Sequence, residues 1–253
     1  MKIISWNVNG LRAAARHGLL DAIRSTDPDI LCLQEIKAQP DDLPPELLAI
    51  SGYESYFNPA QIKGYAGTAI YTKIKPLAVE FDILSNQQIK DEGRTMLLEF
   101  EHFSLLNIYV PHGSRDKSKL IYKLRFYALL QEFVTSYTNK PLIITGDFNV
   151  AQADIDLARP KQNRSNTMFT PEERSALKGI LELGFVDTFR HLHKNQVTYS
   201  WWPYLANARE RNIGWRIDYA LASRHLVGKV KEASILTDIY GSDHCPTLID
   251  VKI

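Results

Sequence analysis

The chain has 253 residues, a length typical of one large domain or two small ones. Hydrophobic residues make up 45% of it and charged residues 23%, close to the averages of globular proteins, which excludes disordered, collagen-like and disulfide-scaffold classes. Thirty basic and 29 acidic side chains leave a net charge of +1. No overall field therefore attracts a polyanion, and a nucleic-acid site would have to be a local basic patch.

We expect residues 1–253 to form a single domain, because no low-complexity linker and no repeat of about 20 to 50 residues interrupts the chain. Only two cysteines occur, Cys32 and Cys245. No apolar run approaches the ~20 residues that span a bilayer, and no secretory leader opens the chain. These features predict an intracellular protein without membrane association, in the cytoplasm or nucleoid, or in the nucleus of a eukaryote.

The predicted strands and helices alternate irregularly. In chain order they are a strand over 2–6, a short helix within 11–25, strands over 29–33, 67–73, 96–101 and 104–110, a helix over 118–137, a strand over 141–145, a helix after Thr170, and strands over 197–202, 217–223 and 247–251. The helix over 118–137 has apolar residues at three- and four-residue spacing. The next begins with the capping-box sequence Thr170-Pro171-Glu172-Glu173 and is expected to stop at Gly184. Many strands without strict βαβ alternation predict mixed sheets covered by helices.

Polar residues stand where several predicted strands begin or end. If these strands share an edge, the side chains form one cluster on its rim, where functional sites often lie. Asp and Asn also cap strands and form turns, which explains any one of them alone, but the repeated placement favours a site. The residues are Asn7, Gln34, Glu35, Tyr109, Asp147, Asn149, Asp218, Asp243 and His244.

This set contains the parts that phosphodiester cleavage needs. Glu35 and Asp243 offer the oxygen ligands that Mg²⁺ prefers. Asp147, together with Asn149, is a candidate to activate or position the attacking water. The geometry of these roles is a hypothesis at this stage.

The charge that accumulates on phosphate would be stabilised by Asn7, Tyr109 and a protonated His244. Asp218 is a candidate to fix the tautomer of that imidazole. Cys245 beside His244 is disfavoured as a thiol nucleophile, because adjacent residues of an extended segment point to opposite faces. The chain has no Gly-x-Ser-x-Gly, no phosphate-binding Gly-rich loop, and no Cys-x-x-Cys or His-Glu-x-x-His, so serine hydrolase, nucleotide-cofactor and zinc chemistries lack support.

Most of these polar residues belong to five short segments of the sequence. In their content and their order along the chain, the segments resemble those of the exonuclease III-type abasic-site endonucleases. Each segment alone is weak evidence, but the ordered set runs through essentially the whole chain and is strongly specific. The wider superfamily, which includes DNase I-like nucleases, inositol-phosphate phosphatases and sphingomyelinases, shares the catalytic segments, so they indicate phosphoesterase chemistry and not DNA as the substrate. The five segments are Ser5–Arg12, Leu31–Glu35, Gly146–Asn149, Gly214–Tyr219 and Gly241–Pro246.

The resemblance implies an α+β fold, a four-layer αβ sandwich in which two mixed β-sheets pack face to face with helices on the outside. It implies that Glu35 binds Mg²⁺, for which Mn²⁺ can substitute, with Asn7 and Asp243 nearby. The implied catalytic residues are Tyr109, Asp147, Asn149, Asp218 and His244.

Two further segments, Tyr199–Trp202 and Asn207–Asp218, resemble the segments that distinguish the DNA-repair branch from the rest of the superfamily. In that branch the stretch builds an apolar pocket for a flipped sugar without a base, a slot too small for most intact nucleotides. Tryptophan is more often a core residue, and Trp202 fits that interpretation. The resemblance assigns Trp201, Leu205, Asn212, Trp215 and Ile217 to the pocket and its rim, with Leu205 entering the DNA.

Basic segments within 111–119 and 158–166 suit a DNA backbone, and Arg209, Arg211 and Arg216 flank the tryptophans. By resemblance, Arg12 and Tyr65 contact phosphates.

Three positions depart from the family pattern. His112 stands where many members have Asn or Gln against phosphate, Asn9 stands where some have Asp, and Arg115 lies in a loop that varies among members. Because imidazole titrates, we expect phosphate binding at His112 to weaken above neutral pH.

We therefore predict a Mg²⁺-dependent DNA repair endonuclease that hydrolyses the phosphodiester 5′ to an abasic site in duplex DNA and leaves a 3′-hydroxyl. We expect 3′-phosphodiesterase and 3′→5′ exonuclease activities as well, and a monomer. One alternative is a phosphoesterase of the same fold acting on RNA, inositol phosphates or lipid headgroups, which Trp201 and Trp215 disfavour. The other is a DNA-binding protein that has lost catalysis, which the full set of catalytic candidates disfavours.

Overall fold

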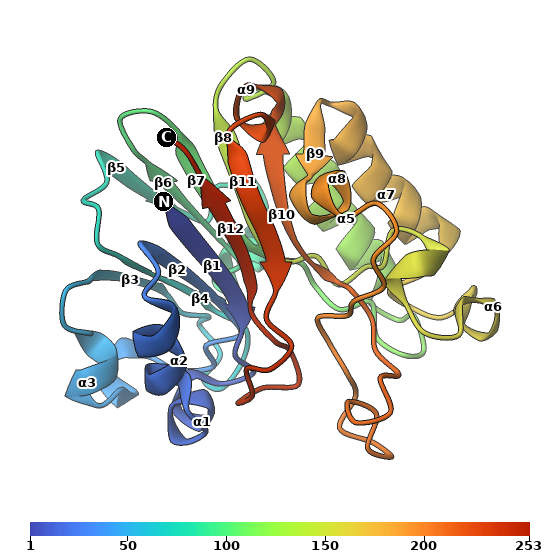
Figure 1. The fold of residues 1–253 in the computed structure, drawn as a ribbon, viewed down its shortest axis with the longest axis horizontal. Coiled ribbons are helices and arrows are strands. Elements are labelled where there is room, and N and C mark those ends of the chain that lie inside the picture. The colour runs from blue at the N-terminus through green and yellow to red at the C-terminus, as the bar shows by residue number, and fades with distance from the viewer.

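A computed structural model describes residues 1–253 and contains two six-stranded mixed sheets (Figure 1). The first sheet has the order β11-β12-β1-β2-β4-β3, and the second has the order β5-β6-β7-β8-β10-β9. The strands of the first are β1 (Lys2–Asn7), β2 (Ile30–Gln34), β3 (Glu54–Asn58), β4 (Thr68–Thr72), β11 (Val230–Ile235) and β12 (Thr247–Val251). Those of the second are β5 (Ala78–Phe81), β6 (Thr95–Glu99), β7 (Ser104–Tyr109), β8 (Leu142–Asp147), β9 (Phe185–Asp187) and β10 (Asp218–Ser223).

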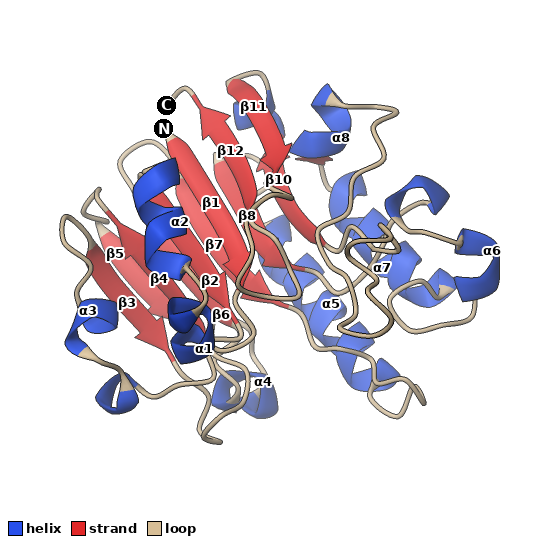
Figure 2. Cartoon of the chain, turned by 60° about the horizontal axis from the view of Figure 1, so that its bottom comes forward, coloured by secondary structure: helices blue, strands red, loops and turns tan.

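Helices cover the outer faces of the two sheets. Figure 2 shows α1 and α2 over the first sheet, and α5 and α7 lie against the second. The helices are α1 (Leu11–Arg16), α2 (Leu19–Thr26), α3 (Pro45–Leu48), α4 (Gln87–Asp91), α5 (Leu120–Thr135), α6 (Pro160–Asn163), α7 (Pro171–Glu182), α8 (Thr188–Leu192) and α9 (Arg224–Val227). No helix has the length and apolar character required to cross a membrane.

Alternation along the central strands explains the layers. In β2, Ile30 and Cys32 face the core between the sheets, whereas Leu31 and Leu33 pack under α1 and α2. Such a strand is apolar on both faces because both are buried. A third core lies between the second sheet and the helices α5 and α7. The predicted four-layer sandwich is confirmed.

The helix signals in the sequence are largely confirmed. Thr170 caps α7, Pro171 is its first residue, and Glu173 completes the capping box. The expected single helix within 11–25 is wrong, because Gly18, with a φ of 97°, divides that segment into α1 and α2. The left-handed conformation at that glycine cannot continue a right-handed helix.

The strand signals succeeded at the centre of the sheets and failed at their edges. The predicted strand over 197–202 is wrong: the segment is a loop in which Trp201 forms isolated bridges with Trp215 and His244. The strands β3, β5, β9 and β11 were missed. All four are the edge strands of the two sheets, where partial exposure interrupts the apolar run that marks a buried strand.

A close approach between β7 and β8 depends on Gly146. This residue has a φ of 142°, and a Cβ atom placed on it would lie 1.9 Å from the carbonyl oxygen of Ile108. Only glycine fits here, so the pairing that sets Tyr109 opposite Asp147 depends on it.

We expect Gly146→Ala to lower the free energy of unfolding by at least about 2 kcal/mol, because the added methyl must push two core strands apart. Gly228→Ala is the matched control, since that position has open space around it and no positive φ. Urea unfolding of both variants measures the difference. Equal losses of stability would show that the close approach does not constrain the fold.

Candidate active site

Strand ends from both sheets meet at one edge of the sandwich. Asn7 is the register partner of Gln34 in the parallel pair β1–β2. In the second sheet, Asp147 is the register partner of both Tyr109 in β7 and Asp218 in β10. Residues far apart in the sequence therefore converge at this edge.

The side chain of Asn7 joins two carboxylates across the sheets. Its Nδ2 donates to Glu35 Oε1 and to Asp147 Oδ2, each at 2.8 Å, and its Oδ1 accepts from the backbone N–H of Asn9 at 3.0 Å. Asn7 is fully buried. It therefore acts here as a donor that fixes two acids.

A tight turn after β8 holds Asn149 over Asp147. The backbone N–H of Asn149 donates to Asp147 Oδ1 at 2.8 Å, and its Nδ2 donates to the carbonyl of Val110 at 2.9 Å. The φ of Asn149 is 51°, a conformation that Asn tolerates. Burial, together with the neighbouring Asp218 carboxylate, raises the pKa of Asp147 to about 8. A carboxylate with a raised pKa is a stronger base than an ordinary one.

The pair His244 and Asp218 is buried beside Asp147. His244 Nδ1 lies 2.9 Å from Asp218 Oδ2, and His244 Nε2 lies 4.0 Å from Asp147 Oδ2. Ser200 Oγ also donates to Asp218 Oδ2 at 2.6 Å. Burial alone would lower the pKa of His244, but the Asp218 carboxylate outweighs it and raises the pKa to about 10. The imidazole is therefore a cation with Nε2–H facing the cluster.

Tyr109 lies on a buried cation. The guanidinium of Arg94 sits 4.5 Å from the ring centroid of Tyr109 and donates to its carbonyl at 3.1 Å. The other end of this guanidinium donates to the hydroxyl of Tyr65 at 3.0 Å. Burial and the carboxylate of Glu35 hold the pKa of Tyr109 well above its usual range. Its hydroxyl therefore stays protonated, as a hydrogen-bond donor.

An apolar pocket wall adjoins this cluster. Trp201 and Trp215 meet edge to face with ring centroids 6.5 Å apart, and Trp201 forms a bridge with His244. Phe169 packs edge to face against the other side of Trp215 at 6.3 Å. The apolar residues that pack together here are Ala151, Leu157, Met168, Phe169, Trp201, Trp215 and Ile217.

Comparison with known proteins shows to which family a chain with this arrangement belongs. The model of the Endonuclease/Exonuclease/phosphatase family matches residues 4–244. The chain belongs to this family.

Its relatives extend over the whole chain. It is 45% identical over 258 residues to an exodeoxyribonuclease of Bacillus subtilis, with both chains covered completely. It is 46% identical over 255 residues to recombination repair protein 1 of Drosophila melanogaster, but spans 37% of that longer protein. The solved structure of an AP endonuclease from Archaeoglobus fulgidus superposes with a TM-score of 0.91 at 31% identity, with both chains covered completely. The chain is thus related to DNA repair nucleases.

The ligand atoms of Glu35, Asp147 and His244 lie within 4.8 Å of one another, so this corner of the family's site can hold a metal ion. A protonated His244 has no lone pair to give, which leaves carboxylate oxygens as the donors. Such a set suits a hard cation such as Mg²⁺. The Glu35 side chain is 17% exposed, and Lys37 Nζ lies 2.8 Å from its Oε2.

Asp243 stands slightly apart from that cluster. Asn9 Nδ2 donates to its Oδ1 at 2.9 Å, and Trp201 Nε1 donates to its Oδ2 at 3.0 Å. Both oxygens are engaged, so Asp243 ties the apolar wall to the end of β1.

The residues predicted to contact DNA are spread around the cluster. Arg12 and Arg115 are exposed, and Leu205 is 69% exposed at the tip of a loop. The Oδ1 of Asn212 accepts from Trp202 Nε1 at 3.3 Å, and Trp202 packs outside the apolar wall.

His112 lies in the loop before α5 and is bonded to that loop. Its Nδ1 accepts from the backbone N–H of Ser114 at 3.0 Å, which leaves Nε2 as the donor of a neutral ring. The surrounding loop withdraws part of the imidazole from water and lowers its pKa. The expected weakening of phosphate binding above neutral pH stays a prediction.

Two of the three arginines expected to offer their charge to DNA are committed elsewhere. Arg216 is buried and pairs with Asp156 at 2.8 Å and Asp187 at 2.7 Å, so its assignment to the DNA surface is wrong. Arg209 donates to the carbonyls of residues 237, 239 and 242 and stacks on Trp202 and Tyr240. Arg211 stays exposed.

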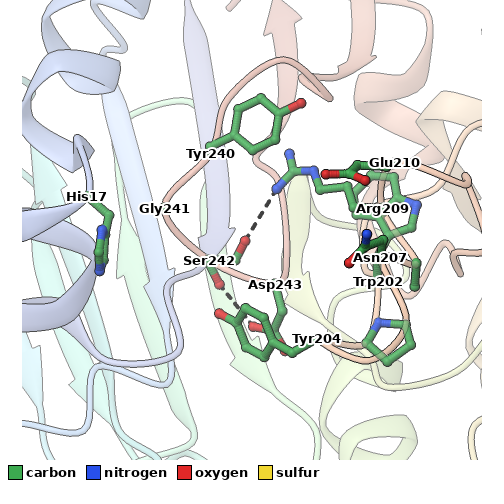
Figure 3. Close-up of a pocket in the computed structure, with 12 residues that line it drawn as sticks. His17, Trp202, Tyr204, Asn207, Arg209, Glu210, Tyr240, Gly241, Ser242 and Asp243 are labelled. Carbon is green, nitrogen blue, oxygen red and sulfur yellow. Dashed lines mark hydrogen bonds between the residues drawn. The ribbon is translucent and has the colours of Figure 1, made fainter.

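A surface cavity of about 530 Å³ opens beside Asp243. Figure 3 shows Arg209 and Trp202 on one side of it and His17 on the other, with Tyr240 above and Tyr204 below between them. The cavity lies between the loop that carries Leu205 and the turn before β12.

Sequence reasoning missed several residues that shape the site. Ser200 and Arg94 are polar residues inside buried segments. A polar residue in such a segment was the feature of the sequence that could have pointed to them. Met168 gave no signal, because its proximity to Trp215 depends on the path of a loop.

We expect Asp218→Asn to lower the pKa of His244, because the carboxylate that raises it is removed. The imidazole should then be neutral at pH 8, and turnover should fall about 10²- to 10⁴-fold while DNA affinity stays near that of the parent. ¹⁵N NMR of the ring nitrogens and single-turnover kinetics measure the two effects. Ser200→Ala, which keeps the carboxylate, serves as the control. A His244 that remains doubly protonated at pH 8 in Asp218→Asn would contradict this role.

Proposed function

We propose that the chain hydrolyses the phosphodiester 5′ to an abasic site in duplex DNA and leaves a 3′-hydroxyl, with trimming of 3′ ends as a related activity. The observation that carries this proposal is the junction of a buried His244–Asp218 pair with an apolar wall formed by Trp201, Trp215 and Ile217. A phosphate at the polar cluster would place its baseless sugar against that wall. The names of the relatives, exodeoxyribonuclease and AP endonuclease, support the same substrate.

The residues of the cluster divide the work of hydrolysis. Asp147 accepts the proton of the attacking water, and Asn149 Oδ1, which makes no hydrogen bond within the protein, holds that water. The protonated His244 and the hydroxyl of Tyr109 donate hydrogen bonds to the scissile phosphate. Asp218 keeps His244 charged and oriented.

Mg²⁺ is the proposed metal, with Mn²⁺ as a substitute, and Glu35 is its proposed ligand with Asp147 adjacent. When bound, the ion neutralises charge on the phosphate. Asn7 fixes both carboxylates by its two hydrogen bonds, so it orients the ligands.

The protein is proposed to act as one catalytic domain, residues 1–253, and as a monomer. Arg12, Tyr65, His112, Arg115 and Leu205 are proposed to contact the duplex around the abasic site. Because such backbone contacts are ionic, affinity should fall steeply with salt.

Purified protein with an end-labelled duplex carrying one stable abasic-site analogue tests the proposal. We expect a Mg²⁺-dependent cut immediately 5′ to the analogue, no cut in EDTA, and little cleavage of an intact duplex. Shortening of both duplexes from their 3′ ends would instead make the protein chiefly an exonuclease. No cleavage with either metal would reject a DNA substrate and favour RNA, inositol phosphates or lipid headgroups.

Trp215→Ala tests the pocket separately from the chemistry. Removing this indole opens the apolar wall, so affinity for abasic DNA should fall about 10-fold or more while affinity for intact duplex changes little. Fluorescence anisotropy with both DNAs in EDTA measures the two affinities. Trp202→Phe is the control, because Trp202 packs in a separate cluster with Tyr199 and Cys245. Equal losses on both DNAs would assign Trp215 to the core alone.

A further inference from the structure

A buried ion pair outside the cluster links the first turns of α5 and α7. The ammonium of Lys123 pairs with Glu173 Oε1, and both side chains are completely withdrawn from solvent. Removing two charges from water is costly, and an ion pair rarely repays that cost through stability alone. The other hydrogen bonds of Lys123 and Glu173 show which chain segments this ion pair holds in place.

The first of these contacts is the turn that carries Asn149. Lys123 Nζ donates to the carbonyl of Asn149 at 2.6 Å. Because Asn149 adopts a left-handed backbone, its carbonyl turns away from the regular ladder of β8 and needs a donor from elsewhere. The buried ammonium supplies that donor.

The second contact is the segment that supplies Met168 to the apolar wall. Glu173 Oε1 accepts from the backbone N–H of Met168 at 2.9 Å and from the hydroxyl of Thr167 at 3.2 Å, and its Oε2 accepts from the backbone N–H of Thr170 at 3.0 Å. Met168 has a φ of 69°, which is unusual for a residue with a side chain. Such a conformation persists only where its surroundings impose it.

The two held segments also bond to each other. The backbone N–H of Ala151, two residues after Asn149, donates to the carbonyl of Met168 at 2.8 Å. Met168 and Ala151 then pack against Trp215 and Ile217. One ion pair therefore sets both the turn that holds the water and the wall that faces the sugar.

The contact between Lys123 Nζ and Glu173 Oε1 has the geometry of an ion pair. Burial lowers the pKa of Lys123, although Glu173 opposes that shift. Burial also opposes ionisation of Glu173, but the ammonium and the two backbone donors outweigh it and hold its pKa below its usual range. The contacts are thus charge-assisted, and so shorter and more directional than neutral ones.

We propose that Lys123 and Glu173 are positioning residues, whose buried ion pair holds Asn149 and Met168 in a fixed relation, so that the water and the baseless sugar are placed together. This inference rests on the proposed function. It makes the pair a determinant of turnover and of abasic-site discrimination, and not of general DNA affinity.

The test replaces the pair without leaving a buried charge. In Lys123→Met with Glu173→Met, both sets of contacts are lost. In Lys123→Met with Glu173→Gln, the amide oxygen can still accept from Met168 and Thr167, which donate to Oε1 in the parent. The link to Asn149 is lost, together with the bond from Thr170 to Oε2. Leu130→Ala is the matched control, because Leu130 is a buried residue of the same helix that packs in the core behind the second sheet. All variants are compared at a temperature at which circular dichroism shows them folded.

We expect both double variants to lose about 10- to 100-fold in kcat on the abasic duplex with Mg²⁺, with affinity for intact duplex within about twofold of the parent. Lys123→Met with Glu173→Met (Met/Met) should also lose its preference for abasic over intact DNA. Lys123→Met with Glu173→Gln (Met/Gln) should keep that preference. Leu130→Ala should retain parental kcat. Parental kcat in a folded double variant, or an equal loss in Leu130→Ala, would overturn the proposal. If Met/Met does not fold, the kcat of Met/Gln decides whether Lys123 acts through Asn149.

A second measurement does not depend on activity. Amide hydrogen exchange at Asn149 and Ala151 should accelerate in Met/Met relative to Leu130→Ala, because the pair holds their segments. Unchanged exchange at both amides would overturn the proposal. Failure of the parent to cut abasic DNA would instead reject the proposed function, and the exchange data would still test whether the pair holds these two segments.

Discussion

One amide group holds the two halves of the site together. Asn7 ends β1 in the first sheet, and its Nδ2 reaches both Glu35 and Asp147, which ends β8 in the second. The shared donor offsets part of the repulsion between these two acids, although burial and the neighbouring Asp218 still raise the pKa of Asp147 to about 8. The sheets are joined again beneath this point, where Gln34 donates to Asn107 at 2.7 Å. The spacing between the sheets, and with it the geometry of the cluster, depends on these contacts.

The cluster is an arrangement of opposed charges in a dry environment. Asp147 and Asp218 are buried acids on neighbouring strands, and His244 lies against both. The imidazolium reduces the repulsion between the acids, and the acids keep the imidazolium charged. A phosphate that enters this space meets donors that are already oriented, so little reorganisation is needed as charge develops on it.

The sequence allowed the fold and the centre of the site to be predicted, for different physical reasons. Buried central strands such as β2 and β8 leave apolar runs, and the polar residues that end them mark the rim. The family motifs add the relation between distant segments, such as Gly146–Asn149 and Gly241–Pro246. Edge strands such as β11 leave no such run, because half of their residues face water.

What the sequence could not supply was the partner of each charged side chain. Arg216 lies between two tryptophan-containing segments and was assigned to the DNA surface, yet a buried Asp156 claims it. Lys123 and Glu173 are ordinary helix residues in the sequence, and only the packing of α5 against α7 brings them together. Pairing between residues 50 positions apart depends on tertiary structure, which local patterns do not encode.

The first sheet has a consequence for the order in which the chain matures. Its central strand β1 lies between β2 and β12, so one of its two neighbours comes from more than 200 residues further along the chain (Figure 1). His244 and the turn that contacts Asn7 through Ser242 arrive with that same final segment. A chain in which this segment is not yet docked carries Glu35 and Asp147 but has no imidazolium beside them. The cluster is therefore complete only once the segment that carries His244 has joined the sheet beside β1.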